Sequence, residues 1–125
     1  MPLKLQADRI DGTNAIARHS LEGVIVNGAP YTSSVLVPWQ GNVRGWPVSR
    51  FEELSEAHFD VLVDLLPELV IFGSGPRLRF VAPRLLRGLM ARRIGVETMD
   101  TAAACRTYNV LFSEGRCVVA ALLFE

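Results

Sequence analysis

Cysteine, lysine and long apolar runs are scarce in this 125-residue chain. Two cysteines are too few for a disulfide-stapled scaffold in a domain of this length, so both thiols are expected to be reduced. The longest apolar run extends only from Cys117 to Phe124, whereas a membrane-spanning helix needs about 20 residues. The opening residues, MPLKLQADRIDG, lack the apolar segment of a signal peptide and the composition of a transit peptide. These absences predict a cytoplasmic protein that does not insert into a membrane.

Net charge is also absent, because 13 acidic residues balance 13 basic ones. Without an overall positive field, we expect no nucleic-acid partner. The charges are nevertheless segregated along the chain. Between residues 52 and 68 every charged residue is acidic: Glu52, Glu53, Glu56, Asp60, Asp64 and Glu68. Between residues 77 and 93 every charged residue is arginine: Arg77, Arg79, Arg84, Arg87, Arg92 and Arg93. The segregation favours a protein-binding surface, whereas the preference for arginine over lysine is equally typical of codon bias.

Half of the residues are hydrophobic and 21% are charged, which is the composition of a folded protein. We therefore predict a single α/β domain over residues 1–125, with residues 1–14 poorly ordered. The first half is typical of β-structure. Strands are predicted at residues 16–19, 21–26 and 31–37, with a short one at 43–46. Asn27-Gly28 predicts a tight hairpin turn, because both positions of such a turn favour a positive φ.

The second half alternates between strands and helices. The first helix is predicted at residues 56–66 and is capped by Ser55, with Ser49 and Glu52 as an alternative start. A second helix is predicted from Pro83 to a C-cap at Gly95. A third is predicted at 101–114, capped by Asp100. The second of these is expected to turn Leu85, Leu86, Leu89 and Met90 inward. Strands are predicted at 69–72, 96–99 and 116–124, the last being apolar on both faces and therefore central. Such a β-α-β-α-β order gives parallel neighbours. With the N-terminal antiparallel hairpin added to it, the expected fold is a three-layer α/β/α domain with a mixed central sheet.

Several segments resemble a known family. They are the helix Met99-Asp100-Thr101-Ala102-Ala103-Ala104-Cys105-Arg106-Thr107-Tyr108-Asn109-Val110-Leu111 with the following Glu114-Gly115-Arg116, the element Val70-Ile71-Phe72-Gly73-Ser74-Gly75, and Asn27-Gly28. The chain resembles the domain-of-unknown-function 498 family, whose members include mitochondrial complex I assembly factor 3, and looks like a bacterial-type member. The resemblance covers roughly residues 16–124 and implies a three-layer α/β fold with a mixed sheet. It implies no particular reaction.

The loop Gly73-Ser74-Gly75 is the first candidate binding site, because it follows a strand at the edge where open α/β sheets bind ligands. Its glycines would allow close approach of a phosphate, and the Ser74 hydroxyl would donate a hydrogen bond. The dinucleotide fingerprint is incomplete, because its third glycine would fall at Leu78. A tight turn that requires a positive φ is the alternative interpretation.

Four polar residues on the two following helices complete the candidate site. Arg84 lies in the first turn of its helix, where a cation opposes the helix dipole, so a bound anion would relieve the conflict. Thr101 opens the next helix, and Arg106 and Asn109 project away from its apolar stripe. Together with the glycine loop, these residues would line one pocket. The alternatives are a solvated arginine face, helix-start chemistry at Thr101 and a surface asparagine.

No catalytic or metal-binding residue and no cofactor are predicted. Cys105 falls on the apolar side of its helix, which argues against a nucleophile. Trp39 and Trp46 are either an exposed interaction patch or buried anchors for their loop. We therefore expect a non-enzymatic protein-interaction or assembly module with an unidentified protein partner. The alternative is a binder, or an enzyme, for a small anion or nucleotide-like ligand at residues 73–75 and Thr101.

Overall fold

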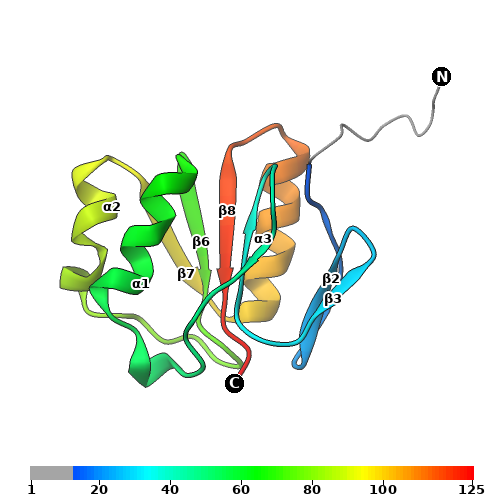
Figure 1. Cartoon of the computed structure of the whole chain (residues 1–125), viewed down its shortest axis with the longest axis horizontal. Coiled ribbons are helices and arrows are strands. Elements are labelled where there is room, and N and C mark those ends of the chain that lie inside the picture. The colour runs from blue at the N-terminus through cyan, green and yellow to red at the C-terminus, as the bar shows by residue number, and fades with distance from the viewer. Residues whose placement is uncertain (1–12) are drawn as a thin grey trace.

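The computed structural model describes residues 13–125 and contains two β-sheets with helices around the larger one (Figure 1). The larger sheet has the order β5-β4-β8-β6-β7. Its strands are β4 (Val35–Pro38), β5 (Arg44–Gly45), β6 (Leu69–Gly73), β7 (Gly95–Met99) and β8 (Val118–Leu122). Strand β6 pairs in parallel with β7 and β8, whereas β4 pairs with β8 in the antiparallel sense. The predicted mixed sheet is confirmed, and β8 lies at its centre.

The helical segments occupy both faces of this sheet. They are η1 (Phe51–Glu53), α1 (Glu56–Asp60), η2 (Val61–Leu65), η3 (Pro83–Leu86), α2 (Arg87–Ala91) and α3 (Thr101–Ser113), where η denotes a 3₁₀ helix. Local capping signals set the starts of three of them. The Ser55 backbone N–H donates to His58 Nδ1 at 3.0 Å, Pro83 opens η3, and the Asp100 carboxylate accepts from Ala103 N at 2.9 Å. The predicted starts at these three positions are confirmed.

Two details predicted for the second helix are wrong. Gly95 is not its C-cap: α2 ends at Ala91, Arg93 adopts the left-handed conformation with φ 59°, and Gly95 begins β7. Gly95 instead makes room for a neighbouring strand, because a Cβ there would lie 3.0 Å from Leu69 Cδ1. Met90 points outward and is 54% exposed, whereas Leu85 and Leu89 are buried. The 3₁₀ turn at the start has three residues per turn, which shifts the helical phase expected from the sequence.

The N-terminal hairpin forms its own sheet instead of joining the central one. Asn27 and Gly28 have φ values of 51° and 84°, so the predicted turn between two antiparallel strands is confirmed. This sheet contains β1 (Ile16–Ser20), β2 (Gly23–Val26) and β3 (Ala29–Tyr31). The single strand predicted at 31–37 is divided between β3 and β4. Every residue of β4 is buried, which suits a sheet covered on both faces, whereas β2 alternates between buried and half-buried positions.

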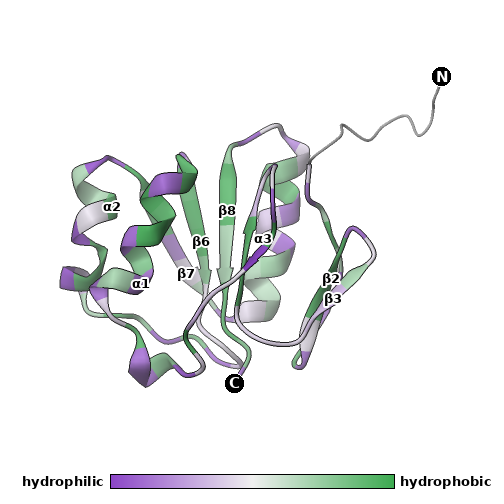
Figure 2. Cartoon of the chain, viewed as in Figure 1, coloured by the Kyte–Doolittle hydropathy of each residue, from purple (hydrophilic) through white to green (hydrophobic). Residues whose placement is uncertain are grey.

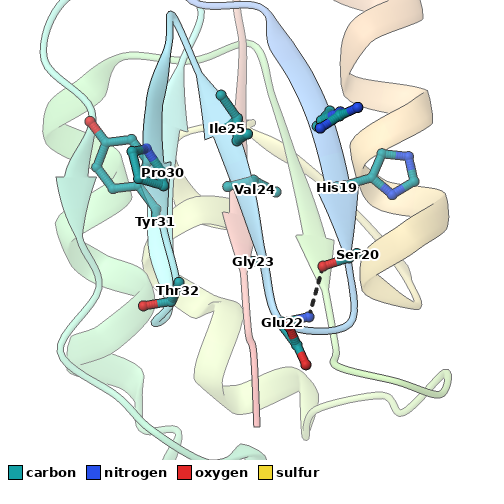
Figure 3. A pocket seen from close by; sticks show the side chains of 10 residues that line it. His19, Ser20, Glu22, Gly23, Val24, Ile25, Pro30, Tyr31 and Thr32 are labelled. Carbon is teal, nitrogen blue, oxygen red and sulfur yellow. Dashed lines mark hydrogen bonds between the residues drawn. The ribbon is translucent and has the colours of Figure 1, made fainter.

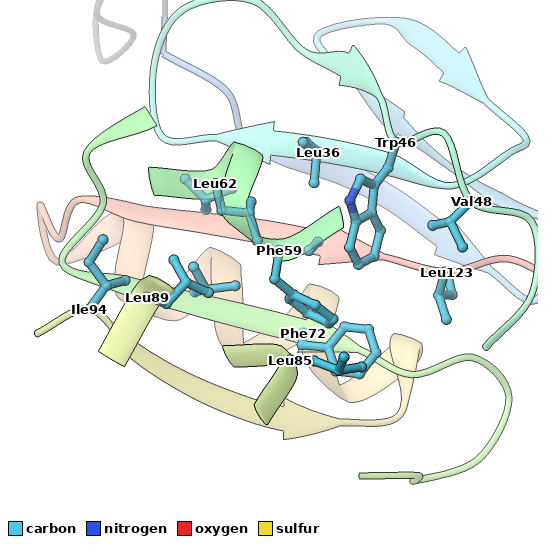
Figure 4. Close-up of a cluster of buried hydrophobic side chains, with 13 residues drawn as sticks. Leu36, Trp46, Val48, Phe59, Leu62, Phe72, Leu85, Leu89, Ile94 and Leu123 are labelled. Carbon is cyan, nitrogen blue, oxygen red and sulfur yellow. The ribbon is translucent and has the colours of Figure 1, made fainter. Parts of the chain in front are cut away.

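Two apolar clusters hold the layers together, one on each face of the central sheet. The ribbons of β6 and β8 between them are coloured as hydrophobic in Figure 2, and Figure 4 shows the first cluster. Along β8 and the residue after it, successive side chains alternate between the clusters. Val119, Ala121 and Leu123 belong to the first, with α1 and α2, and Val118, Ala120 and Leu122 belong to the second, with α3 and the three-stranded sheet. This period of two confirms that β8 is covered on both faces and gives the expected three-layer arrangement.

The first cluster is built around aromatic rings that meet edge to face (Figure 4). The ring centroids of Phe59 and Phe72 are 5.5 Å apart, and Trp46 lies 5.6 and 6.0 Å from them. The indole N–H of Trp46 donates to the His58 carbonyl at 2.9 Å. Trp46 is therefore a buried anchor, and Trp39 packs half-buried against the same cluster. An exposed tryptophan patch is not formed.

Of the residues expected to be poorly ordered, residues 1–12 lie outside the described part of the chain. Asn14 is described and is only 3% exposed. Its side-chain amide donates to the Pro38 carbonyl at 2.9 Å and accepts from Asn27 Nδ2 at 2.7 Å. Asn14 thus ties the start of the described chain to the central sheet and to the hairpin turn.

Candidate functional site

The carboxyl end of β6 is where an open parallel sheet would bind a ligand, and three predicted site residues follow one another there. Gly73, the last residue of β6, lies directly against the start of α3. A Cβ at Gly73 would lie 2.9 Å from Thr101 Oγ1 and 3.0 Å from Leu122 Cδ2. The absence of a side chain at this position therefore lets the helix approach the sheet.

Thr101 and Gly75 bind each other through their backbone and side-chain groups. The Gly75 N–H donates to Thr101 Oγ1 at 2.8 Å, and the Thr101 N–H donates to the Gly75 carbonyl at 2.9 Å. The Thr101 hydroxyl donates in turn to the Leu123 carbonyl at 2.9 Å. The Thr101 hydroxyl thus donates one hydrogen bond and accepts another, and both partners belong to the protein. Thr101 is only 6% exposed.

Ser74 is engaged in the same way. Its hydroxyl donates to the Arg77 carbonyl at 2.8 Å and accepts from the Arg79 N–H at 3.0 Å, and the residue is fully buried. The groups expected to cradle a phosphate therefore hold the loop and the helix start together. The predicted tight turn at Gly75 is present, with a φ of 104°.

Arg79, which was not among the predicted site residues, covers this loop. Its Nη2 donates to the Ser74 carbonyl at 2.8 Å and pairs with the Glu125 carboxylate, and its Nη1 lies 3.7 Å from Glu52 Oε2. The guanidinium carbon lies 4.5 Å from the centroid of the Phe51 ring, within the range of a cation–π contact. Nothing in the sequence separates Arg79 from the other arginines of its segment, because its partners come from distant parts of the chain.

The electrostatics of this cluster are clearest at Glu125. Burial acts to raise the pKa of its carboxyl, but hydrogen bonds from Arg79 and from the Phe51 N–H, the latter at 3.0 Å, outweigh that effect. The pKa therefore lies below its ordinary value of 4.5, and the ionised form is the one that the fold stabilises.

The other three predicted site residues are not brought into this cluster. Asn109 lies beside β1, where its Oδ1 accepts from the Ile16 N–H at 2.9 Å and its Nδ2 donates to the Ile16 carbonyl at 2.7 Å. Arg84 and Arg106 are exposed. The structure therefore brings Gly73, Ser74, Gly75 and Thr101 together, whereas the Asn109 side chain is bonded to β1, so the single pocket expected for all seven residues is not formed. The two hydrogen bonds of the Asn109 side chain instead connect α3 to β1 of the three-stranded sheet.

Cys105 and Tyr108 lie in the second core cluster with no exposed area. Burial raises the pKa of the Cys105 thiol to about 12, although the nearby Arg106 charge partly opposes the rise. This agrees with the interpretation of Cys105 as a core residue. The Tyr108 hydroxyl donates to the Asn14 carbonyl at 2.6 Å, and burial raises the pKa of the phenol as well. Within residues 13–125, no group of histidine, cysteine or carboxylate side chains has the arrangement of a metal site.

Hollows on the surface lie elsewhere. One, of about 440 Å³, lies on the three-stranded sheet and is lined by residues of its three strands, among them His19, Ile25 and Tyr31 (Figure 3). A larger and more apolar one, of about 800 Å³, is lined by Trp39, Phe112 and neighbouring residues. Neither hollow is lined by any of the seven predicted site residues. Both lie beside the small sheet and not at the carboxyl end of β6.

The arrangement just described, a five-stranded mixed sheet with an antiparallel three-stranded sheet beside it, is shared with solved bacterial proteins. A crystal structure from Bordetella parapertussis has a TM-score of 0.87 and 34% sequence identity, covering 94% of this chain and all of that one. A solution structure from Xanthomonas campestris has a TM-score of 0.79 and 35% identity, covering 99% of this chain and 92% of that one. The fold class is therefore that of these mixed α/β domains.

The chain belongs to the family described as "Protein of unknown function (DUF498/DUF598)", whose sequence model matches residues 16–123. It is similar to the NADH dehydrogenase [ubiquinone] 1 alpha subcomplex assembly factor 3 of Bos taurus, with 36% identity over 111 residues, and to that of Homo sapiens, with 33% identity over 121 residues. These alignments cover 86% and 94% of this chain but only 59% and 61% of the relatives. In residues 13–125, no helix has both the length and the apolar character needed to cross a bilayer.

Proposed function

We propose that this chain is a non-enzymatic protein-interaction module that assists the assembly of a multi-subunit complex in the cytoplasm. The observation that carries the proposal is the saturation of the polar groups at the carboxyl end of β6. Gly75 N–H, Thr101 Oγ1 and Ser74 Oγ are all bonded within the protein. A ligand entering there would have to break these buried hydrogen bonds, and each broken bond costs about 1–3 kcal/mol.

The family adds support, because the mitochondrial relatives are named as assembly factors of an NADH dehydrogenase. Assembly needs surfaces that recognise subunits, and it does not need a constellation of catalytic groups. Cys105 is buried with a raised pKa, and the His58 ring contacts Ser55 Oγ and the Pro47 carbonyl. The names of the relatives suggest that this complex is an NADH dehydrogenase.

Two measurements on the purified full chain test this proposal. The first is thermal unfolding of the wild type with and without millimolar inorganic phosphate, ATP or citrate. A ligand present at 100 times its Kd would stabilise the fold by about 2.7 kcal/mol, which raises the Tm by several degrees. We expect no such rise. A rise with any of these anions would support the alternative function, a binder of small anions, and would overturn the proposal.

The second measurement is native mass spectrometry of the tag-free chain isolated at low salt from the cells that normally produce it. We expect a complex with at least one other protein in a fixed ratio. The complex should weaken as salt rises, because charged surfaces contribute to its formation. Recovery of the chain free of any protein partner at every salt concentration would contradict the proposal.

A further inference from the structure

The segment that leaves the glycine loop carries exposed apolar side chains between two exposed arginines, Arg77 and Arg84; we call residues 77–84 the arginine–phenylalanine segment. Leu78 is 51% exposed and Phe80 is 71% exposed, although both are large apolar residues. Arg79 between them turns inward, with only 15% of its side chain exposed. The two apolar side chains therefore stand on the outside because the cation between them occupies the inside.

Hydrogen bonds fix the backbone of this segment. Ser74 Oγ binds both the Arg77 carbonyl and the Arg79 N–H, and Arg79 Nη2 returns to the Ser74 carbonyl. The Arg79 guanidinium also stacks on the Phe51 ring and pairs with Glu125. Phe80 is consequently presented by a fixed loop, and a partner that binds it has little loop entropy to remove.

The charges around Phe80 are unbalanced. The positive charge of Arg79 is compensated by Glu125 and Glu52. Arg77 and Arg84 are exposed and form no ion pair with any described residue. Between residues 69 and 96 the sequence contains no acidic residue at all. Phe80 is therefore an exposed apolar side chain with unpaired cations on both sides of it along the chain, at Arg77 and Arg84.

We propose that the arginine–phenylalanine segment is the surface that binds a protein partner, and that the partner presents an apolar segment flanked by carboxylates. This inference rests on the proposed interaction function and names its site. Arginine and large aromatic residues are the types that supply most binding energy at protein interfaces. The planar arginine fork binds carboxylates through two hydrogen bonds, so Arg77 and Arg84 would select an acidic partner.

Site-specific crosslinking provides the test, with p-benzoylphenylalanine placed at position 80 in one variant and at position 21 in another. Leu21 is the matched control, because it is 73% exposed and lies in the turn between β1 and β2, away from this segment. We expect crosslinks to one protein from position 80 and none from position 21. The crosslinked peptide, identified by mass spectrometry, should be an apolar stretch next to aspartate or glutamate.

Binding of that peptide, made synthetically, is then measured by fluorescence anisotropy with the purified chain. Phe80→Ser should weaken binding at least about tenfold, whereas Leu21→Ser should change it less than about twofold. Arg84→Glu should weaken binding at low salt and have a smaller effect at high salt. Equal affinities for the wild type and Phe80→Ser would overturn the inference.

The remaining outcomes separate this inference from the proposed function. Crosslinks from position 21 alone would overturn the docking surface and leave an interaction function standing. Absence of protein crosslinks from both positions, together with anion-dependent stabilisation, would overturn both. Cosedimentation of the wild type with phosphatidylglycerol vesicles, lost in Phe80→Ser, would show that the segment binds lipid and would also overturn the inference.

Discussion

Replacing Thr101 by valine tests the conclusion that the carboxyl-edge loop is a structural joint. Valine has nearly the same shape but cannot donate to the Leu123 carbonyl or accept from the Gly75 N–H. The Gly75 N–H and the Leu123 carbonyl then each lose their hydrogen bond to the Thr101 hydroxyl, in a buried site where Thr101 is only 6% exposed. A buried polar group without a partner costs about 1–3 kcal/mol, so Thr101→Val should lower the free energy of unfolding by about 2–4 kcal/mol.

The assay is urea denaturation followed by the fluorescence of the buried Trp46. Thr107→Val is the matched control on the same helix, because Thr107 is half-buried and its hydroxyl makes no hydrogen bond to a described residue. It should cost less than about 0.5 kcal/mol. Thr101→Ser keeps the hydroxyl and should lose only about 1 kcal/mol for its missing methyl group. A loss for Thr101→Val no larger than that of Thr107→Val would refute the structural role.

Three further predictions follow from the same contacts. Gly73→Ala should cost about 1–3 kcal/mol because its Cβ would press on the start of α3, whereas Gly45→Ala, with open space around it, should be nearly neutral in the same denaturation assay. The pKa of Glu125 is lower in the folded than in the unfolded chain, so its ion pair stabilises the fold above about pH 4.5, and this stabilisation is lost as the pH falls further. In a pH series of unfolding midpoints, Glu125→Gln should therefore lose less stability in acid than the wild type. Identical losses would contradict this prediction. In thiol labelling of the folded chain at pH 8, the half-buried Cys117 should react well before Cys105, whose burial raises its pKa to about 12, and faster labelling of Cys105 would disprove the core assignment.

The features that were predicted from the sequence depend on neighbouring residues. Asp100 caps α3 because the N–H that its carboxylate accepts from is only three residues away. Asn27-Gly28 turns the chain because of its own backbone preferences, and Pro83 begins a helix because its φ is already set. The apolar character of β8 on both of its faces likewise predicted that this strand lies at the centre of a covered sheet.

The features that were missed depend on residues far apart in the chain. The stretch 31–37 reads as one strand, but β4 pairs with β8 and β3 pairs with β2, so it divides between two sheets. Arg93, and not Gly95, takes the left-handed conformation after α2, because the place of Gly95 is fixed by its contact with Leu69 on the neighbouring strand. A local pattern does not contain the position of such partners.

The candidate site divides in the same way. The sequence by itself offered a tight glycine turn after β6 as one of two interpretations, and it predicted that Thr101 begins a helix behind the Asp100 cap, because both follow from local backbone chemistry. Only the tertiary structure decided where their polar groups point. Asn109 binds Ile16 from 93 positions away, and Arg79 turns inward to meet Glu125, which leaves Phe80 outside. The direction of a polar side chain depends on which distant donor or acceptor packing brings within about 3 Å, and that distance exists only once the layers have assembled.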